Sequence, residues 1–227
     1  MNILLTNDDG YFATGINLLK YKLSKYGRVV VVAPKKAMSA KSVSITIGES
    51  VEVKKLADDF YYMEGTPADC VAFGLSSLNV KFDLVVSGCN DGFNISYDIM
   101  YSGTVGACLQ ALTFRIPALA ISCAGNFLLV EDHFNEVMEY ILKNKMLSIE
   151  YLLNVNFPLG DRVDKIVLTS IHYRPHVTYY ISDGNDHYHA WRDIKDEDCD
   201  EIGSDVYAVY HHQISITKIN KTGIYKE

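Results

Sequence analysis

The fold is decided by residues 3–10, which read ILLTNDDG. The first four are apolar or β-branched without polar alternation, a pattern typical of a strand buried on both faces of a parallel sheet. Asn7 to Gly10 are turn formers, and the apolar residues that follow recur at roughly helical spacing. We therefore expect Asp8 and Asp9 at the carboxyl end of a central strand, where open α/β sheets place their ligand crevice.

Two adjacent carboxylates at such a strand end favour a divalent metal. Each raises the proton affinity of the other unless a cation shares them, and oxygen ligands suit a hard cation. The alternative is an Asx-type turn or a helix cap made by Asp8 or Asp9 alone.

Composition bounds the class of protein. The chain has 227 residues, of which 48% are hydrophobic and 22% charged, enough for one large or two small domains. A net charge of -7 argues against a nucleic acid polymer as partner, because phosphate-backbone surfaces need clustered Lys and Arg. We find no signal-like leader and no apolar run near ~18 residues, so we expect no membrane insertion and a cytoplasmic location. Five scattered cysteines without a CxxC pair are expected to be reduced core thiols.

Strand and helix signals alternate along the chain and predict an α/β fold with a mostly parallel sheet flanked by helices. Alternating apolar residues at 45–62 predict a hairpin-like annex. Helices are predicted over 66–78 and 131–142. Further strands are predicted at 29–33, 82–86, 118–121, 152–157, 166–168, 206–209 and 214–216. We divide the chain into a metal- and phosphate-binding core, 1–145, and C-terminal strands with an arm, 146–227, within one globular unit.

Three further segments lie at the predicted sheet edge. The serine-rich loop 35–44 could bring a hydroxyl to the metal, or could simply be a solvated loop. Asn90, after the strand at 82–86, supplies a neutral oxygen. In residues 101–107 a glycine and small residues open a helix whose free N–H groups could hold a phosphate. A Ser/Thr helix cap is the alternative there, and for Thr104 alone it is the more common case.

Together these pieces resemble the SurE family of metal-dependent survival-protein nucleotidases. The motifs occur in order: ILLTNDDG, VVAP followed by a serine loop, GTPADCV, DLVVSG-x-N and YSGTV. The resemblance continues from Asn154-Val155-Asn156 to Ser215-Ile216. It implies a Rossmann-like core, a smaller β-rich C-terminal region used in oligomer contacts, and hydrolysis of nucleoside 5′- and 3′-monophosphates, sometimes with polyphosphate. The implied ligands of one divalent ion, Mg²⁺ or Mn²⁺, are Asp8, Asp9, Ser39 and Asn90. The implied phosphate-binding residues are Asn94, Ser102, Gly103 and Thr104.

The chain departs from the family pattern at four places. Ala40 stands where glycine usually follows the ligand serine, and Met38 stands where a basic or polar residue often precedes it. Asp91 adds an acid beside Asn90, and the chain ends at Glu227 where many members continue into a helix.

The residue types suggest a mechanism in which the metal activates water and the phosphate loop holds the remaining oxygens. Asp8 and Asp9 are the catalytic candidates, and either could act as the base or attack directly. Two alternatives stay open. A haloacid-dehalogenase-type phosphatase spaces its acids one residue apart and needs a downstream lysine, and a non-catalytic nucleotide-binding module would show G-x-G-x-x-G after the first strand.

The segment from His172 to Glu201 is rich in Tyr and His and carries the single tryptophan, Trp191. It is too long for an ordinary loop and lacks core periodicity, while aromatic surface favours interfaces. We predict an oligomerisation arm, a homodimer or homotetramer, and Trp191 buried between chains. The alternative is an acidic flap on a monomer.

Overall fold

The structure is a computed structural model that describes residues 1–173, 176–194 and 201–220. Nine strands form one sheet in the order β3-β4-β2-β1-β5-β6-β7-β11-β8. Their bounds are β1 Asn2–Thr6, β2 Arg28–Pro34, β3 Val53–Ala57, β4 Phe60–Met63, β5 Leu84–Asp91, β6 Ala118–Cys123, β7 Tyr151–Asn156, β8 Lys165–Thr169 and β11 Gln213–Asn220. Neighbouring strands from β4 to β7 run parallel, and so do β11 and β8. The pairs β3–β4 and β11–β7 are antiparallel. The predicted mostly parallel α/β sheet is confirmed.

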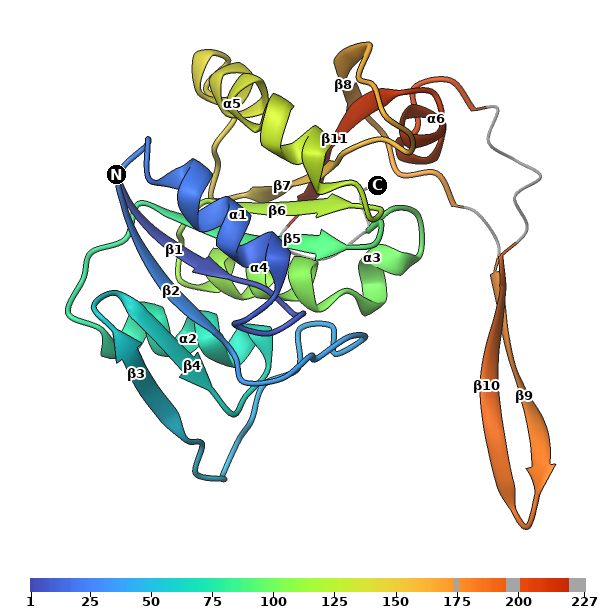
Figure 1. Cartoon of the computed structure of the whole chain (residues 1–227), viewed down its shortest axis with the longest axis horizontal. Coiled ribbons are helices and arrows are strands. Elements are labelled where there is room, and N and C mark those ends of the chain that lie inside the picture. Colours follow the sequence, from blue (N-terminus) through green and yellow to red (C-terminus); the bar gives the residue numbers. More distant parts are fainter. Residues whose placement is uncertain (174–175, 195–200, 221–227) are drawn as a thin grey trace.

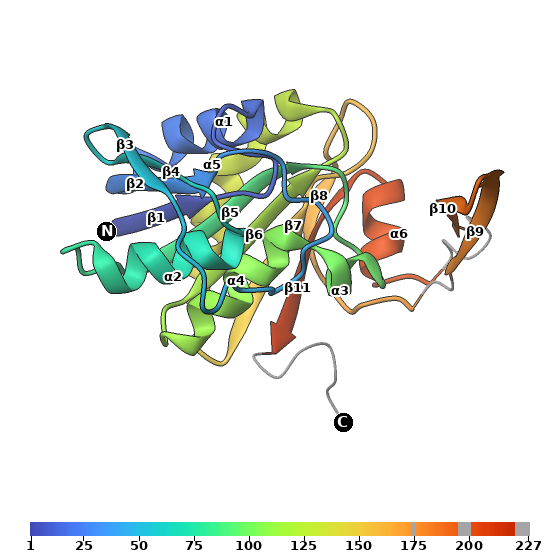
Figure 2. The same cartoon turned by 90° about the horizontal axis from the view of Figure 1, so that it is seen from below.

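Helices cover both faces of this sheet (Figure 2). Helices α1 (Thr14–Leu23) and α5 (Phe127–Lys143) lie on one face, and α2 (Pro67–Ser77) and α4 (Gly103–Thr113) lie on the other. The described part of the chain also contains two short helices, α3 (Asp98–Tyr101) and α6 (Asp205–Tyr210). None of the helices in this part is long and apolar enough to cross a membrane.

The unbroken apolar run of β1 is explained by this layering. Ile3 and Leu5 point into the core beneath α1 and α5, whereas Leu4 points into the core beneath α2 and α4. Because alternate residues of a strand face opposite sides, a strand covered on both faces needs apolar residues at every position.

The predicted helix at 66–78 is confirmed as α2. Thr66 is its N-cap, with Pro67 at the first helical position. The Thr66 hydroxyl accepts a hydrogen bond from the Asp69 N–H, and the Asp69 carboxylate accepts one from the Thr66 N–H, which forms a capping box.

The strand predicted at 206–209 is wrong, because these residues lie in α6. Ser204 caps this helix by accepting a hydrogen bond of 3.0 Å from the Tyr207 N–H. A run of four residues, VYAV, is too short for periodicity to separate a strand from a buried helical turn. The cap at Ser204 was the signal that favoured the helix.

The predicted annex is only partly confirmed. β3 and β4 form the hairpin, but residues 45–51 form no strand. Thr46 instead donates from its N–H and its hydroxyl to the Asp69 carboxylate, at 2.8 and 2.7 Å. The Asp69 carboxylate thus accepts from the Thr46 N–H, which would have paired with a neighbouring strand if these residues had formed one.

The predicted arm is a separate antiparallel hairpin of β9 (His176–Gly184) and β10 (His187–Ile194). Figure 1 shows it projecting away from the body of the protein. The four cysteines in the described residues are free and buried, as expected, and Cys199 lies outside those residues. Residues 221–227, which follow β11, also lie outside the residues that the structure describes, so the expected departure from the family at the C-terminal helix stays a prediction.

Candidate functional site

A cavity of about 240 Å³ opens at the carboxyl edge of the parallel strands. It is lined by residues from four segments of the chain: the turn after β1, the loop after β2, the end of β5 with the loop that follows it, and the α3–α4 junction. The lining residues are Asp8, Asp9, Ser39, Ala40, Asn90, Asp91, Asn94, Asp98, Tyr101 and Ser102. The structure therefore brings all four expected metal ligands and two of the four expected phosphate-binding residues to one place.

Asp8 lines this cavity and is buried, with only 5% of its surface exposed. Its Oδ1 accepts a hydrogen bond of 2.5 Å from the Thr104 hydroxyl. Burial raises the pKa of Asp8 to about 6, the Thr104 hydrogen bond opposes that shift, and the charge of Asp9 adds to it. A buried carboxylate in this state gains most from a cation placed against it.

Asp9 is partly exposed and faces the end of β5. Its Oδ2 accepts a hydrogen bond of 3.3 Å from the Asp91 N–H. Burial raises the pKa of Asp9, that N–H donor lowers it, and the Asp91 charge raises it. The Asp91 carboxylate itself accepts a hydrogen bond of 2.9 Å from the Gly125 N–H. It adds negative potential at the rim of the cavity.

The loop after β2 is fixed beside Asp8. The Met38 N–H donates to the Asp8 carbonyl at 2.7 Å, which places the exposed Ser39 at the cavity. Ala40 has a φ of 57°, in the left-handed region that favours glycine. The departure from the family pattern at this position therefore carries backbone strain of roughly 1 to 2 kcal/mol. The Met38 contact uses the main chain, so it does not depend on a polar side chain at that position.

Asn90 reaches the cavity through an irregularity of β5. The pairing of β5 with β6 shifts register between Ser87 and Asn90. Bulges of this kind re-aim side chains next to functional sites. Asn90 Nδ2 donates to the Gly92 carbonyl at 2.8 Å, which leaves Oδ1 as the carboxamide atom that can face a cation.

The first turn of α4 packs directly against Asp8. Ser102 is the N-cap and accepts a hydrogen bond of 3.1 Å from the Val105 N–H, as the capping alternative expected. A Cβ on Gly103 would lie 2.9 Å from Asp8 Cβ, so only glycine allows this close approach. Thr104 is fully buried and holds Asp8 instead of lining the cavity. Its role in phosphate binding stays a prediction, and the geometry favours an indirect one.

Asn94 lies in the loop between β5 and α3 and is only 5% exposed. Its Nδ2 donates to Ser122 Oγ at 2.8 Å. Sequence reasoning missed Asp98 and Tyr101 as lining residues. Tyr101 is the first residue of the YSGTV motif and Asp98 lies three residues before it, and this proximity was the available signal.

The donor set fits a hard divalent cation. Two carboxylates, a hydroxyl and a carboxamide oxygen are oxygen ligands of the kind that Mg²⁺ and Mn²⁺ take. No three His, Cys, Asp or Glu side chains converge as a metal centre within the residues that the structure describes. A cation here would therefore depend on Asp8, Asp9 and neutral oxygens.

A larger cavity of about 630 Å³ is lined by residues of β7, β8, β11 and the segment after β8. Its described lining includes no acid, so the smaller cavity is the better candidate for chemistry on a phosphate.

Comparison with known proteins identifies relatives that match the chain over most of its length. The family model "Survival protein SurE" matches residues 3–177. The proteins named 5′-nucleotidase SurE from Acinetobacter baylyi and Mannheimia succiniciproducens are 35% and 37% identical to this chain. Each alignment covers 96% of the chain and 93% or 92% of the relative, respectively. The crystal structure of the SurE protein from Aquifex aeolicus superposes with a TM-score of 0.84 at 34% identity, covering 97% of this chain and 94% of that one.

Proposed function

The chain belongs to the SurE family, and on that premise we propose that it is a divalent-metal-dependent phosphomonoesterase acting on nucleoside 5′-monophosphates. The names of its relatives assign it to the 5′-nucleotidases. The structural observation that supports the proposal is the acid pair Asp8 and Asp9 in the lining of the cavity, where Ser39 and Asn90 add neutral oxygens. Hydrolysis of 3′-monophosphates and of short polyphosphate belongs to the same proposal.

The proposed metal is one Mg²⁺ or Mn²⁺ ion held by Asp8, Asp9, Ser39 and Asn90. When bound, such an ion supplies Lewis-acid stabilisation of the charge on the phosphoryl oxygens. It also removes the electrostatic penalty of burying Asp8, whose pKa is about 6 without it.

We assign separate roles to the residues that line the cavity. Asp8 is fixed by Thr104 and serves as an anionic anchor. Asp9 is less buried than Asp8 and lines the cavity, so we assign to Asp9 the uptake of the proton from the attacking water. We assign phosphate binding to Asn94 and Ser102, because both line the cavity and Ser102 caps the amino-terminal end of α4 there.

We also propose that the arm holds a homodimer or homotetramer together. β9 and β10 carry large exposed side chains, among them Tyr180 at 68%, Tyr188 at 61% and Trp191 at 56%. A two-stranded hairpin is marginally stable by itself, and its aromatic surface suits a contact with a second copy. Burial of Trp191 between chains is part of this proposal.

A phosphate-release screen tests the function. The purified chain should release phosphate from nucleoside 5′-monophosphates with Mg²⁺ or Mn²⁺, and the panel should include 3′-monophosphates, polyphosphate and sugar phosphates. Binding of nucleotides without any release would instead support the non-catalytic binding module. Release from sugar phosphates alone would contradict a nucleotidase.

A further inference from the structure

The loop of residues 93–97 joins β5 to α3 and carries Asn94, a residue of the candidate phosphate site. This loop, called the site loop below, contains no helix or strand and includes Ser96 at a φ of 53°. Its position must therefore be set by contacts with other elements.

Two carboxamides of β7 hold the main chain of Asn94. Asn156 Oδ1 accepts a hydrogen bond of 2.8 Å from the Asn94 N–H. The Asn94 carbonyl accepts from Asn154 Nδ2 at 2.7 Å and from Asn156 Nδ2 at 3.1 Å. Asn154 and Asn156 are two residues apart, so they share one face of the strand. Both polar main-chain groups of Asn94 are thus bound by side chains.

These carboxamides lie where apolar residues are expected. β7 lies between β6 and β11 in the sheet, and Asn154 and Asn156 are both 0% exposed. Such strands read as nearly continuous Val, Ile and Leu, and burying a polar group is unfavourable unless it is hydrogen-bonded. In the described part of the chain, every hydrogen bond of these two side chains goes to Asn94. Asn154 Oδ1 is left without a partner there.

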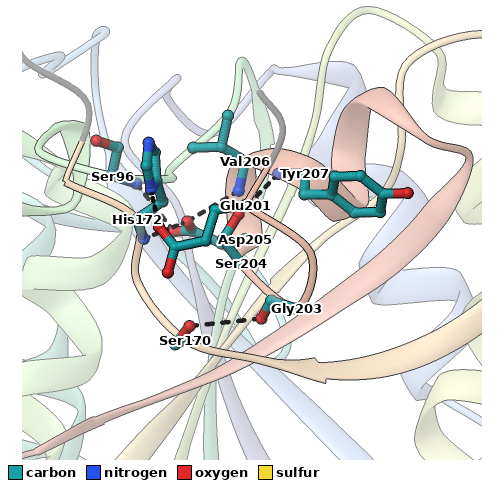
Figure 3. Close-up of polar contacts among 9 residues, drawn as sticks. All are labelled: Ser96, Ser170, His172, Glu201, Gly203, Ser204, Asp205, Val206 and Tyr207. Carbon is teal, nitrogen blue, oxygen red and sulfur yellow. Dashed lines mark hydrogen bonds and ion pairs between the residues drawn. The ribbon is translucent and has the colours of Figure 1, made fainter. Parts of the chain in front are cut away.

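The other end of the site loop is held by Asp205, at the start of α6 (Figure 3). Asp205 Oδ2 accepts a hydrogen bond of 2.9 Å from the Ser96 N–H. Its Oδ1 accepts from the N–H groups of His172 and Val206, each at 2.9 Å. Asp205 is 0% exposed, so this carboxylate has been withdrawn from water to bind three main-chain donors.

We propose that Asn154, Asn156 and Asp205 are positioning residues of the phosphate site, which act on the substrate through the site loop. The inference rests on the proposed function, because it takes Asn94 as a phosphate ligand. Phosphate transfer depends on donors fixed before the reaction, and a displacement of about 1 Å can lower the rate by about 10²-fold.

The kinetic test compares Asn156→Leu with a matched control, Ser215→Ala. Ser215 is also fully buried and lies opposite Asn156 on β11, but its hydroxyl bonds Thr169. Asn156→Leu should raise the KM for a nucleoside 5′-monophosphate and the inhibition constant of inorganic phosphate by about tenfold, the equivalent of one or two hydrogen bonds. The Mn²⁺ affinity of Asn156→Leu should stay within about twofold of the native value. Ser215→Ala should leave the KM, the inhibition constant of phosphate and the Mn²⁺ affinity unchanged. Equal effects of the two variants would overturn the inference.

A double-variant cycle tests whether Asn156 acts through Asn94. Combining Asn94→Ala with Asn156→Leu should raise the phosphate inhibition constant no further than Asn94→Ala alone, because the ligand to be positioned is already absent. Additive losses would contradict the inference.

Amide hydrogen exchange separates this inference from the proposed function. Asn156→Leu and Asp205→Asn should accelerate exchange in residues 93–97, whereas Ser215→Ala should not. Asp205→Asn replaces one of the two acceptor oxygens by a donor group. Unchanged exchange in both variants would overturn the positioning role even in an active enzyme. A native chain that releases no phosphate from any nucleotide, with exchange accelerated as expected, would instead overturn the nucleotidase assignment and the phosphate role of the loop.

Discussion

Thr104 Oγ1 donates a hydrogen bond of 2.5 Å to Asp8 Oδ1, which joins the first turn of α4 to the turn after β1. Both residues are buried: Thr104 is fully buried, and 5% of the surface of Asp8 is exposed. The contact links the two sequence motifs ILLTNDDG and YSGTV, which are far apart in the chain. It gives Thr104 a role that operates through Asp8.

Thr104→Val should therefore weaken metal binding as well as turnover. Valine fills nearly the same volume but leaves Asp8 Oδ1 without its donor, and a hydrogen bond to a charged group contributes about 1.5 to 3 kcal/mol. We expect Mn²⁺ affinity, measured by calorimetry, to fall by about 10-fold or more. Thr104→Ser keeps the hydroxyl and serves as the control. A variant that binds Mn²⁺ normally but turns over slowly would instead favour a direct contact of Thr104 with phosphate.

The raised pKa of Asp8 predicts a pH dependence of stability in the metal-free protein. Its folded pKa of about 6 lies above the ordinary aspartate pKa of 3.8, so the folded state binds more protons than the unfolded state between these values. The free energy of unfolding should fall as pH rises through this window, by up to about 3 kcal/mol at 1.4 kcal/mol per pKa unit.

Asp8→Asn is the matched comparison, because its carbonyl can still accept from Thr104 while carrying no charge. We expect denaturant unfolding with EDTA at pH 7 to show the variant more stable than the native chain, with the difference vanishing near pH 4. A native chain that gains stability between pH 4 and 7 relative to Asp8→Asn would contradict the buried-charge account.

Ala40→Gly should relieve strain in the loop that carries Ser39. The left-handed φ of 57° costs alanine roughly 1 to 2 kcal/mol. Glycine adopts this φ without that strain, but it lowers the stability by about 0.4 to 1 kcal/mol because it increases the conformational entropy of the unfolded chain. We expect a net change in the free energy of unfolding between zero and a gain of about 1.6 kcal/mol, measured by urea titration. Ala37→Gly, in the same exposed loop, should only destabilise. Equal losses in both variants would show that Ala40 is unstrained.

The arm should determine the oligomeric state. Trp191 lies opposite Tyr179 in the β9–β10 register, and they are 56% and 44% exposed. The double variant Tyr179→Ser and Trp191→Ser should shift a dimer or tetramer towards monomer in light scattering. Tyr21→Ser, which changes an exposed tyrosine of α1, is the control. A native chain that is monomeric at all concentrations would refute the arm proposal.

The sequence predicts most strands of the central sheet well because burial on both faces favours apolar residues at nearly every position. β1, β2 and β6 appear as continuous apolar runs for this reason, and the turn-rich ends of β1 and β5 locate the cavity. Local cap chemistry also reads directly from sequence, as at Thr66 and Asp69.

Contacts between distant segments were not predictable in the same way. The hydrogen bonds from Thr104 to Asp8 and from Asn94 to Asn156 depend on how strands and helices are placed relative to one another. The error at 206–209 has a local cause, since a four-residue apolar run fits a buried helical turn as well as a strand.

The most direct test of the proposed activity is phosphate release from a nucleoside 5′-monophosphate by chelator-treated protein, before and after Mn²⁺ or Mg²⁺ is restored. Asp9→Asn is assayed alongside, because it removes one of the two charges on which the cation would depend. We predict that the chelated protein is inactive, that either ion restores release, and that folded Asp9→Asn stays at least about 10²-fold slower with metal present. Full activity in the chelated protein, or an unimpaired Asp9→Asn, would contradict the assignment of the site.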